Sequence, residues 1–255
     1  MPLAPNVSPV RDIRGFDTDG HGTHVCGIAC ANGYGIAPEA DLYVASVIES
    51  ETLMTSMTRV TYGLDWLARE FASDANVERT AVLNMSLGFP STLFGTGASA
   101  DFMQRLGVMH FLIQMMANID VLTVCAIGNS GPGHFGFPGG FPETVGVGAV
   151  DFDHQVADFS GSAPVGQSPP VKPDLVGYGV DVHSALERNR EGKSLYDRLC
   201  GTSMASPYVA GIAALFRSRS PGLSASDVRD ELSRAASVLP NEPSDRVGAG
   251  LARYA

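Results

Sequence analysis

The chain alternates between short apolar runs and longer segments in which apolar residues recur every three or four positions. Short runs of this kind are typical of buried strands, and the longer periodic segments are typical of helices with one apolar face. The expected strands are residues 42–47, 81–85, 121–126 and 144–150. The expected helices are residues 53–71, 99–118, 202–217 and 224–237. Ser224 is a candidate N-cap for the last helix, with Asp227 three residues further on.

Strands that alternate with helices predict βαβ units and a mostly parallel sheet covered by helices. Single α/β domains of about 200–250 residues are common, so we expect one domain over residues 1–255. Ligand sites in such folds lie beyond the carboxyl ends of the strands. The polar segments that follow the expected strands are therefore the first place to look for chemistry.

Charge and composition narrow the possible partners. The chain has 17 Lys and Arg against 27 Asp and Glu, a formal net charge of −10, and no basic block, so no nucleic-acid partner is expected. No apolar run is long enough to span a membrane, and residues 1–6 lack the features of a signal peptide. We expect the chain as it stands to be cytoplasmic, and to be secreted if a signal and a pro-segment precede it.

The sequence predicts no metal site. None of the four cysteines forms a CxxC pair. His21 and His24 are three residues apart, whereas zinc-binding histidines on one helix face are typically four apart with a glutamate between them. We therefore expect neither a metal nor a cofactor.

Three polar, glycine-rich segments adjoin apolar elements, at residues 19–27, 126–133 and 201–211. The first places His21 at the start of an apolar helix, and the second places Asn129 just after a buried strand. The third, Gly-Thr-Ser-Met-Ala-Ser-Pro-Tyr-Val-Ala-Gly, places Ser203 at the start of a helix rich in small residues. Taken singly, these residues have ordinary explanations as a helix cap, a turn asparagine or a structural histidine.

Taken together, the three side chains suit acyl transfer. A serine hydroxyl becomes a useful nucleophile when a base such as imidazole takes its proton. An asparagine amide and the free N–H groups of a helix N-terminus can donate hydrogen bonds to the oxyanion that develops. A role in acyl transfer is therefore a second explanation for these residues, which stands beside the ordinary ones.

In order along the chain, these segments resemble the motifs of the subtilisin-like serine peptidases. The resemblance rests on His-Gly-Thr-His-Val, Gly-Asn-Ser-Gly and Gly-Thr-Ser-Met-Ala-Ser-Pro. Shorter matches follow the same order at residues 35–43, 83–88, 136–139, 145–150 and 248–251. The resemblance covers about residues 11 to 251 and implies a three-layer α/β fold with a mostly parallel sheet.

The resemblance implies a serine endopeptidase in which Ser203 is the nucleophile, His21 the general base and Asn129 an oxyanion donor, with His24 structural. It also implies substrate-binding residues, namely Ser86, Leu87, Gly88, Ala126, Gly128 and Gly136. The first three would pair with an extended substrate backbone, and the others would line the first specificity pocket. The expected partner is a peptide or protein substrate. Calcium sites are common in the family, but no loop here has suitable ligand spacing.

The third member of the triad has no counterpart in this sequence. The resemblance implies an aspartate that ends an apolar strand of the form Val-Ala-Val-Ile-Asp-Thr-Gly, upstream of the histidine. Residues 1–20 contain only Asp12, Asp17 and Asp19, and no such strand. A fold without this strand would have an open sheet edge or face.

Four explanations stay open for the missing aspartate. In the first, the sequence as given starts after the strand that carries the aspartate. In the second, a partner chain supplies that strand. In the third, Asp12, Asp17 or Asp19 takes the place of the triad aspartate. In the fourth, the chain is an inactive relative that binds peptides or a partner chain.

Overall fold

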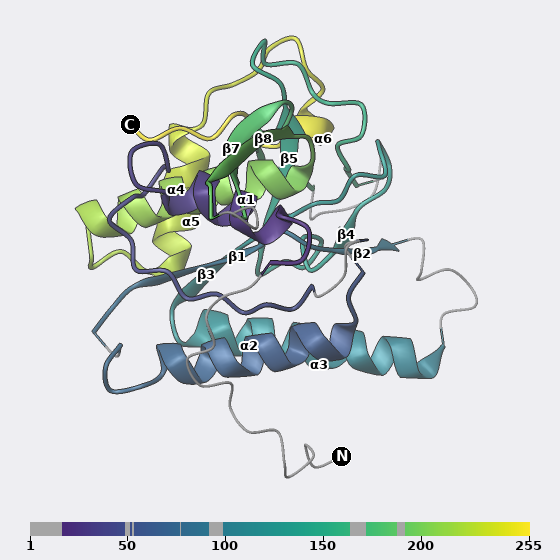
Figure 1. Ribbon diagram of the computed structural model, residues 1–255. Coiled ribbons are helices and arrows are strands. Elements are labelled where there is room, and N and C mark those ends of the chain that lie inside the picture. Colours follow the sequence, from purple (N-terminus) through teal and green to yellow (C-terminus); the bar gives the residue numbers. More distant parts are fainter. Residues whose placement is uncertain are drawn as a thin grey trace.

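Four parallel strands form the central sheet of the computed structural model, in the order β1-β3-β5-β6. Figure 1 labels β1, β3 and β5 of this sheet. Their bounds are β1 (Ala81–Met85), β3 (Val121–Ala126), β5 (Val145–Val150) and β6 (Leu175–Tyr178). In register, Leu83 of β1 lies opposite Thr123 of β3. The structure describes residues 17–48, 52, 54–76, 78–91, 99–163, 172–187 and 192–255.

Helices cover both faces of the sheet. On one face lie α2 (Met57–Phe71) and α3 (Ala100–Asn118), and on the other lie α4 (Thr202–Arg219) and α5 (Ala225–Ala235), as Figure 1 shows. The predicted three-layer α/β architecture is therefore confirmed. Helix α1 (His21–Cys30) packs against α4. Within the described residues, no helix is long and apolar enough to cross a membrane.

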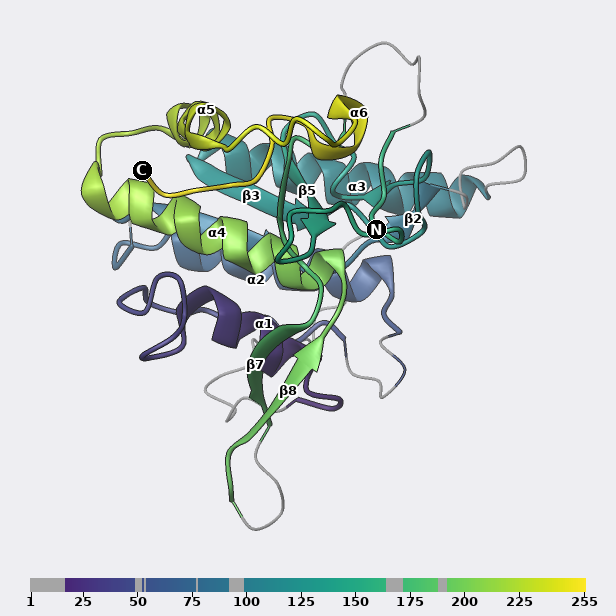
Figure 2. The ribbon, with the colours of Figure 1, turned by 90° about the horizontal axis from the view of Figure 1, so that it is seen from above.

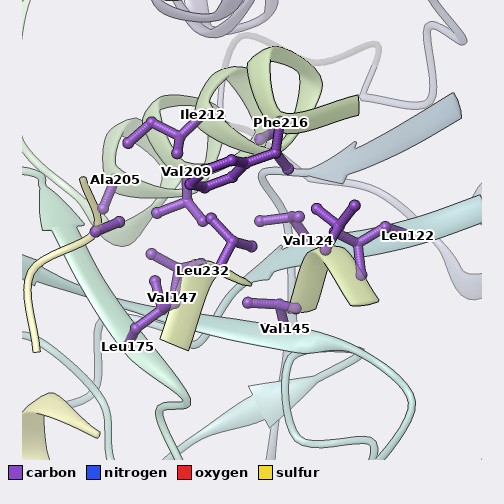
Figure 3. Packing of buried hydrophobic residues seen from close by; sticks show 14 of the residues in the cluster. Leu122, Val124, Val145, Val147, Leu175, Ala205, Val209, Ile212, Phe216 and Leu232 are labelled. Carbon is purple, nitrogen blue, oxygen red and sulfur yellow. The ribbon is translucent and has the colours of Figure 1, made fainter. Parts of the chain in front are cut away.

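The alternation of side chains along β3 divides the core between the two faces. Leu122 and Val124 pack toward α4 and α5, whereas Val121 and Cys125 pack toward α2 and α3. Figure 3 shows the first of these clusters, in which the two β3 residues meet Val209, Ile212, Phe216 and Leu232. Burying each large apolar side chain contributes about 1.5–3 kcal/mol to folding. The core thus holds α4 firmly over the middle of the sheet.

Most predicted elements are present near their expected bounds. Strands β1 and β3 match the prediction, and β5 and α3 each begin one residue later than expected. Ser224 and Asp227 form the predicted capping box at the start of α5. Leu53, the first residue of the helix expected at 53–71, lies outside the described residues.

The predicted strand at residues 42–47 is wrong, because the structure assigns no strand there. Ala45 and Val47 face the cluster beneath α2, whereas Leu42, Tyr43 and Val44 are exposed. Only the second half alternates, with Ala45 and Val47 inward and Ser46 exposed, and the backbone has no strand beside it within the described residues. A strand requires a neighbour to pair its N–H and C=O groups, and this stretch lacks one.

The remaining elements are short and were not predicted. Strands β2 (Phe89–Pro90) and β4 (Gly136–Phe137) form a small antiparallel pair, and α6 (Ser244–Val247) lies near the C-terminus. Strands β7 (Val182–Leu186) and β8 (Leu195–Leu199) form a hairpin that projects beside α1, as Figure 2 shows. Ser184 of this hairpin donates a 2.8 Å hydrogen bond to the His24 carbonyl, which anchors the hairpin to α1.

Candidate active site

The carboxyl ends of β1 and β3 meet the N-terminus of α4. Ser86 directly follows β1, Asn129 lies three residues beyond β3, and Ser203 is the second residue of α4. Hydrogen bonds connect all three places. The structure thus brings together three residues that the sequence singled out, at the end of the sheet where the fold class predicts a ligand site.

Ser203 lies in the first turn of α4, where helical N–H groups have no partner within the helix. Gly201, just before this turn, has φ +152°, a conformation that favours glycine. A Cβ atom there would lie only 3.3 Å from Asn129 Nδ2, so the glycine also allows the asparagine to approach. The Ser203 hydroxyl donates a 3.2 Å hydrogen bond to the Ser86 carbonyl.

The side-chain amide of Asn129 is held in place through its oxygen atom. Its Oδ1 atom accepts hydrogen bonds from the backbone N–H of Thr202 at 2.9 Å and from the Thr202 hydroxyl at 2.8 Å. The Thr202 hydroxyl in turn accepts a bond from the N–H of Gly128 at 3.2 Å. These bonds fix the amide so that its Nδ2 donor, which has no protein partner among the described residues, lies beside the start of α4.

His21 is the first residue of α1, and close contact between α1 and α4 sets its position. Gly211 of α4 allows that contact, because a Cβ there would lie 3.3 Å from the Ala29 carbonyl oxygen of α1 and 2.5 Å from Ile36 Cβ in the loop that follows. Burial lowers the pKa of His21 below its ordinary value of 6.5, and the charges of Asp19 and Asp17 oppose this shift without cancelling it. No hydrogen bond joins the ring of His21 to the hydroxyl of Ser203, which bonds to Ser86 instead.

The aspartates near His21 cap the backbone of α1. Asp17 accepts hydrogen bonds from the N–H groups of Gly20 at 3.2 Å and Thr23 at 2.6 Å. Burial raises the pKa of Asp17, but these backbone donors outweigh it and the net pKa is lowered. Asp19 accepts a 3.0 Å bond from the N–H of His21. Asp12, the third candidate, lies outside the described residues.

His24 is fully buried, and its Nε2 atom lies 3.2 Å from the carbonyl oxygen of Asp197 in the hairpin. Burial lowers its pKa. These contacts suit the structural role that the sequence predicts for it.

The predicted substrate-binding residues lie just after β1, at and after the end of β3, and in β4. Residues 86–88 are not part of a strand but link β1 to β2. Gly128 and Gly136 lie side by side. A Cβ atom on Gly128 would be 3.4 Å from the Gly136 nitrogen. Ala126 is buried at the end of β3.

A large groove opens along the outer edge of β1. It has a volume of about 1520 Å³ and is lined by β1, residues 37–48, α1, α2 and α4, with His21 among its lining residues. Within the described residues β1 pairs only with β3, so the edge that faces the groove carries unpaired backbone groups. Along the described part of the chain, this edge of β1 thus borders a groove that reaches the candidate base.

Sequence reasoning missed the partners that hold the site together. Thr202 orients Asn129, and Asn84 and Ser206 bond to one another next to Ser86. One signal was available, since an asparagine within a buried apolar strand, as Asn84 is, requires a hydrogen-bonding partner.

Comparison with known proteins gives consistent matches. The model of the subtilase family, Peptidase_S8, matches residues 9–250. The Subtilisin-like protease PopC of Myxococcus xanthus is 51% identical over 254 residues, which are 100% of this chain and 53% of PopC. Subtilisin DY of Bacillus licheniformis is 34% identical over 88% of this chain and 72% of its own length.

A solved structure called S41 Psychrophilic Protease matches with a TM-score of 0.71 and 32% identity, over 87% of this chain and 70% of that one. The chain spans about half the length of several curated relatives that it matches, including PopC.

Proposed function

We infer that this chain, which belongs to the subtilase family, is a serine endopeptidase that cleaves peptide bonds through an acyl-enzyme on Ser203. One observation carries the proposal. Asn129 is locked through its Oδ1 atom, so that its Nδ2 donor lies beside the helix turn that holds Ser203. A fixed donor next to a nucleophile is the arrangement that stabilises a tetrahedral oxyanion.

The chemical steps follow from these positions. The hydroxyl of Ser203 attacks the substrate carbonyl while His21 takes its proton and then gives that proton to the leaving amine. Asn129 Nδ2 and the backbone N–H of Ser203 bind the oxyanion. Water, activated by His21, then releases the acyl group from Ser203. Before the attack, the hydroxyl must turn from the Ser86 carbonyl toward His21.

Substrate would lie along residues 86–88, with its backbone paired to theirs. The side chain before the cleaved bond would enter the space beside Ala126, Gly128 and Gly136. The absence of side chains at the two glycines supports this, because it leaves backbone as the wall there. We propose no metal or cofactor for the reaction.

We expect the reaction of Ser203 with a fluorophosphonate probe to depend on pH through His21. The base must be neutral, and burial lowers its pKa, so the rate stays constant down to pH values below 6.5. It then falls as the pH drops through the lowered pKa. Labelling rates measured across the acidic and neutral range check this, and His21→Ala should remove the inflection. An unchanged profile in His21→Ala would contradict the assignment of the base.

The groove along β1 favours a second proposal, in which the chain works with a partner polypeptide. Its occupant would be an extended, apolar strand of that partner, which pairs with the free edge of β1 and brings a carboxylate to His21. Strand addition to an open sheet edge is a common mode of recognition. Alone, the chain would then be a peptide-binding subunit with low activity.

Two observations support a carboxylate from outside the described residues. Asp17 and Asp19 already accept backbone hydrogen bonds at the start of α1. The exposed apolar stretch at residues 42–44 would gain a neighbour when the strand enters.

A further inference from the structure

We propose that a chain of hydrogen bonds through Ser206, Asn84 and Ser86 positions Ser203. The chain ends on the Ser203 carbonyl, which helix α4 itself leaves unpaired. The inference rests on the proposed role of Ser203. It assigns positioning roles to side chains that do not themselves react.

The need for such a cap comes from Pro207. In an α-helix the carbonyl of one residue accepts a hydrogen bond from the N–H four residues later. The partner of the Ser203 carbonyl would be residue 207, but proline has no N–H to donate. The Ser203 carbonyl therefore lacks its helical donor in the very turn that carries the nucleophile.

Ser86 supplies the missing donor from another element. Its hydroxyl donates a 2.8 Å hydrogen bond to the Ser203 carbonyl. Ser86 is buried, with 9% of its surface exposed, so water does not readily replace this bond. The contact is reciprocal, since the hydroxyl of Ser203 donates to the Ser86 carbonyl at 3.2 Å. The first turn of α4 is thus tied to the end of β1.

The remaining bonds fix the direction of the Ser86 proton. Ser206, fully buried in α4, donates to Asn84 Oδ1 at 2.6 Å, so Nδ2 of Asn84 faces Ser86. That Nδ2 donates to the Ser86 hydroxyl oxygen at 3.0 Å. A serine hydroxyl has one proton, and with its oxygen already accepting, that proton goes to the Ser203 carbonyl.

The consequence is a nucleophile whose backbone is fixed from two sides. Thr202 ties the same turn to Asn129, and Ser86 ties it to β1. Loss of either tie would let the turn shift relative to the oxyanion donor. Misplacement by about 1 Å typically costs up to about 100-fold in rate.

A double-mutant cycle between Ser86 and Pro207 tests the proposal. Ser86→Ala should slow fluorophosphonate labelling of Ser203 by about 10-fold to 100-fold, with kcat lowered and KM for a short peptide little changed. Pro207→Ala restores an N–H for the Ser203 carbonyl. In that background we expect Ser86→Ala to cost about threefold or less, because the helix then provides the bond.

Ser233→Ala, which removes an exposed hydroxyl on α5, is the matched control and should leave the rate unchanged. An equal loss in both backgrounds, or no loss in the wild type, would overturn the proposal.

A second readout keeps the proposal testable if the wild type does not label, which would count against the proposed function alone. In chemical denaturation, Ser86→Ala should then lower the midpoint more in the wild type than in Pro207→Ala. Additive midpoint shifts would overturn the positioning role, whatever the activity of the chain.

Discussion

Adding the peptide Val-Ala-Val-Ile-Asp-Thr-Gly to the purified chain is expected to raise its rate of peptide hydrolysis by about 10⁴-fold. The peptide would enter the groove as a strand along the free edge of β1 and place its aspartate near His21. A carboxylate there holds the imidazole in the productive tautomer and stabilises the imidazolium that forms during attack. Loss of that carboxylate from a serine-protease triad costs about this factor.

The same peptide with asparagine in place of aspartate is the control. It should bind with similar affinity, because the apolar strand and backbone are unchanged, but it should not raise the rate. The aspartate peptide should also raise the pKa seen in the pH profile, since a nearby negative charge favours the protonated imidazole. Equal effects of the two peptides, or full activity without either, would contradict the partner-strand proposal.

Asn129→Ala is expected to lower kcat by about 10²–10³-fold with little change in KM, the range for loss of one oxyanion donor, for which a subtilisin is the reference case. The amide Nδ2 binds charge that exists only in the transition state, so substrate binding is spared. Steady-state kinetics in the presence of the aspartate peptide measures both constants.

Two further variants separate donation by Asn129 from its structural bonds. Asn129→Asp keeps an oxygen for Thr202 but removes the donor, so it should lose as much kcat as Asn129→Ala. Asn118→Ala changes an exposed asparagine at the end of α3 and should behave as the wild type. Retention of kcat in Asn129→Asp would show that Asn129 is not an oxyanion donor.

An apolar run was correctly predicted as a strand where a neighbouring strand lies beside it in the described part of the chain. Strands β1 and β3 were predicted with their bounds because both are apolar runs that find neighbours in the sheet. Residues 42–47 have the same pattern but no strand beside them, so pattern alone misled. Strand β6 went unpredicted because it lies in a segment rich in glycine and proline, where local signals favour turns.

The candidate site was predictable where short motifs carry its chemistry. Ser203 and Asn129 follow from their segments, and the structure brings both to one end of the sheet. The use of Asp17 as a helix cap, and the bonds from Ser206 through Asn84 to Ser86, join residues whose proximity depends on folded geometry. Spacing along the sequence cannot indicate such contacts between distant residues.

The most direct test of the proposed function is mass spectrometry of the chain after reaction with a fluorophosphonate in the presence of the aspartate peptide. We predict one adduct, located on Ser203, with no adduct in Ser203→Ala and normal labelling in Ser233→Ala. An adduct on another residue, or none on the folded wild-type chain, would contradict the assignment of Ser203 as the nucleophile.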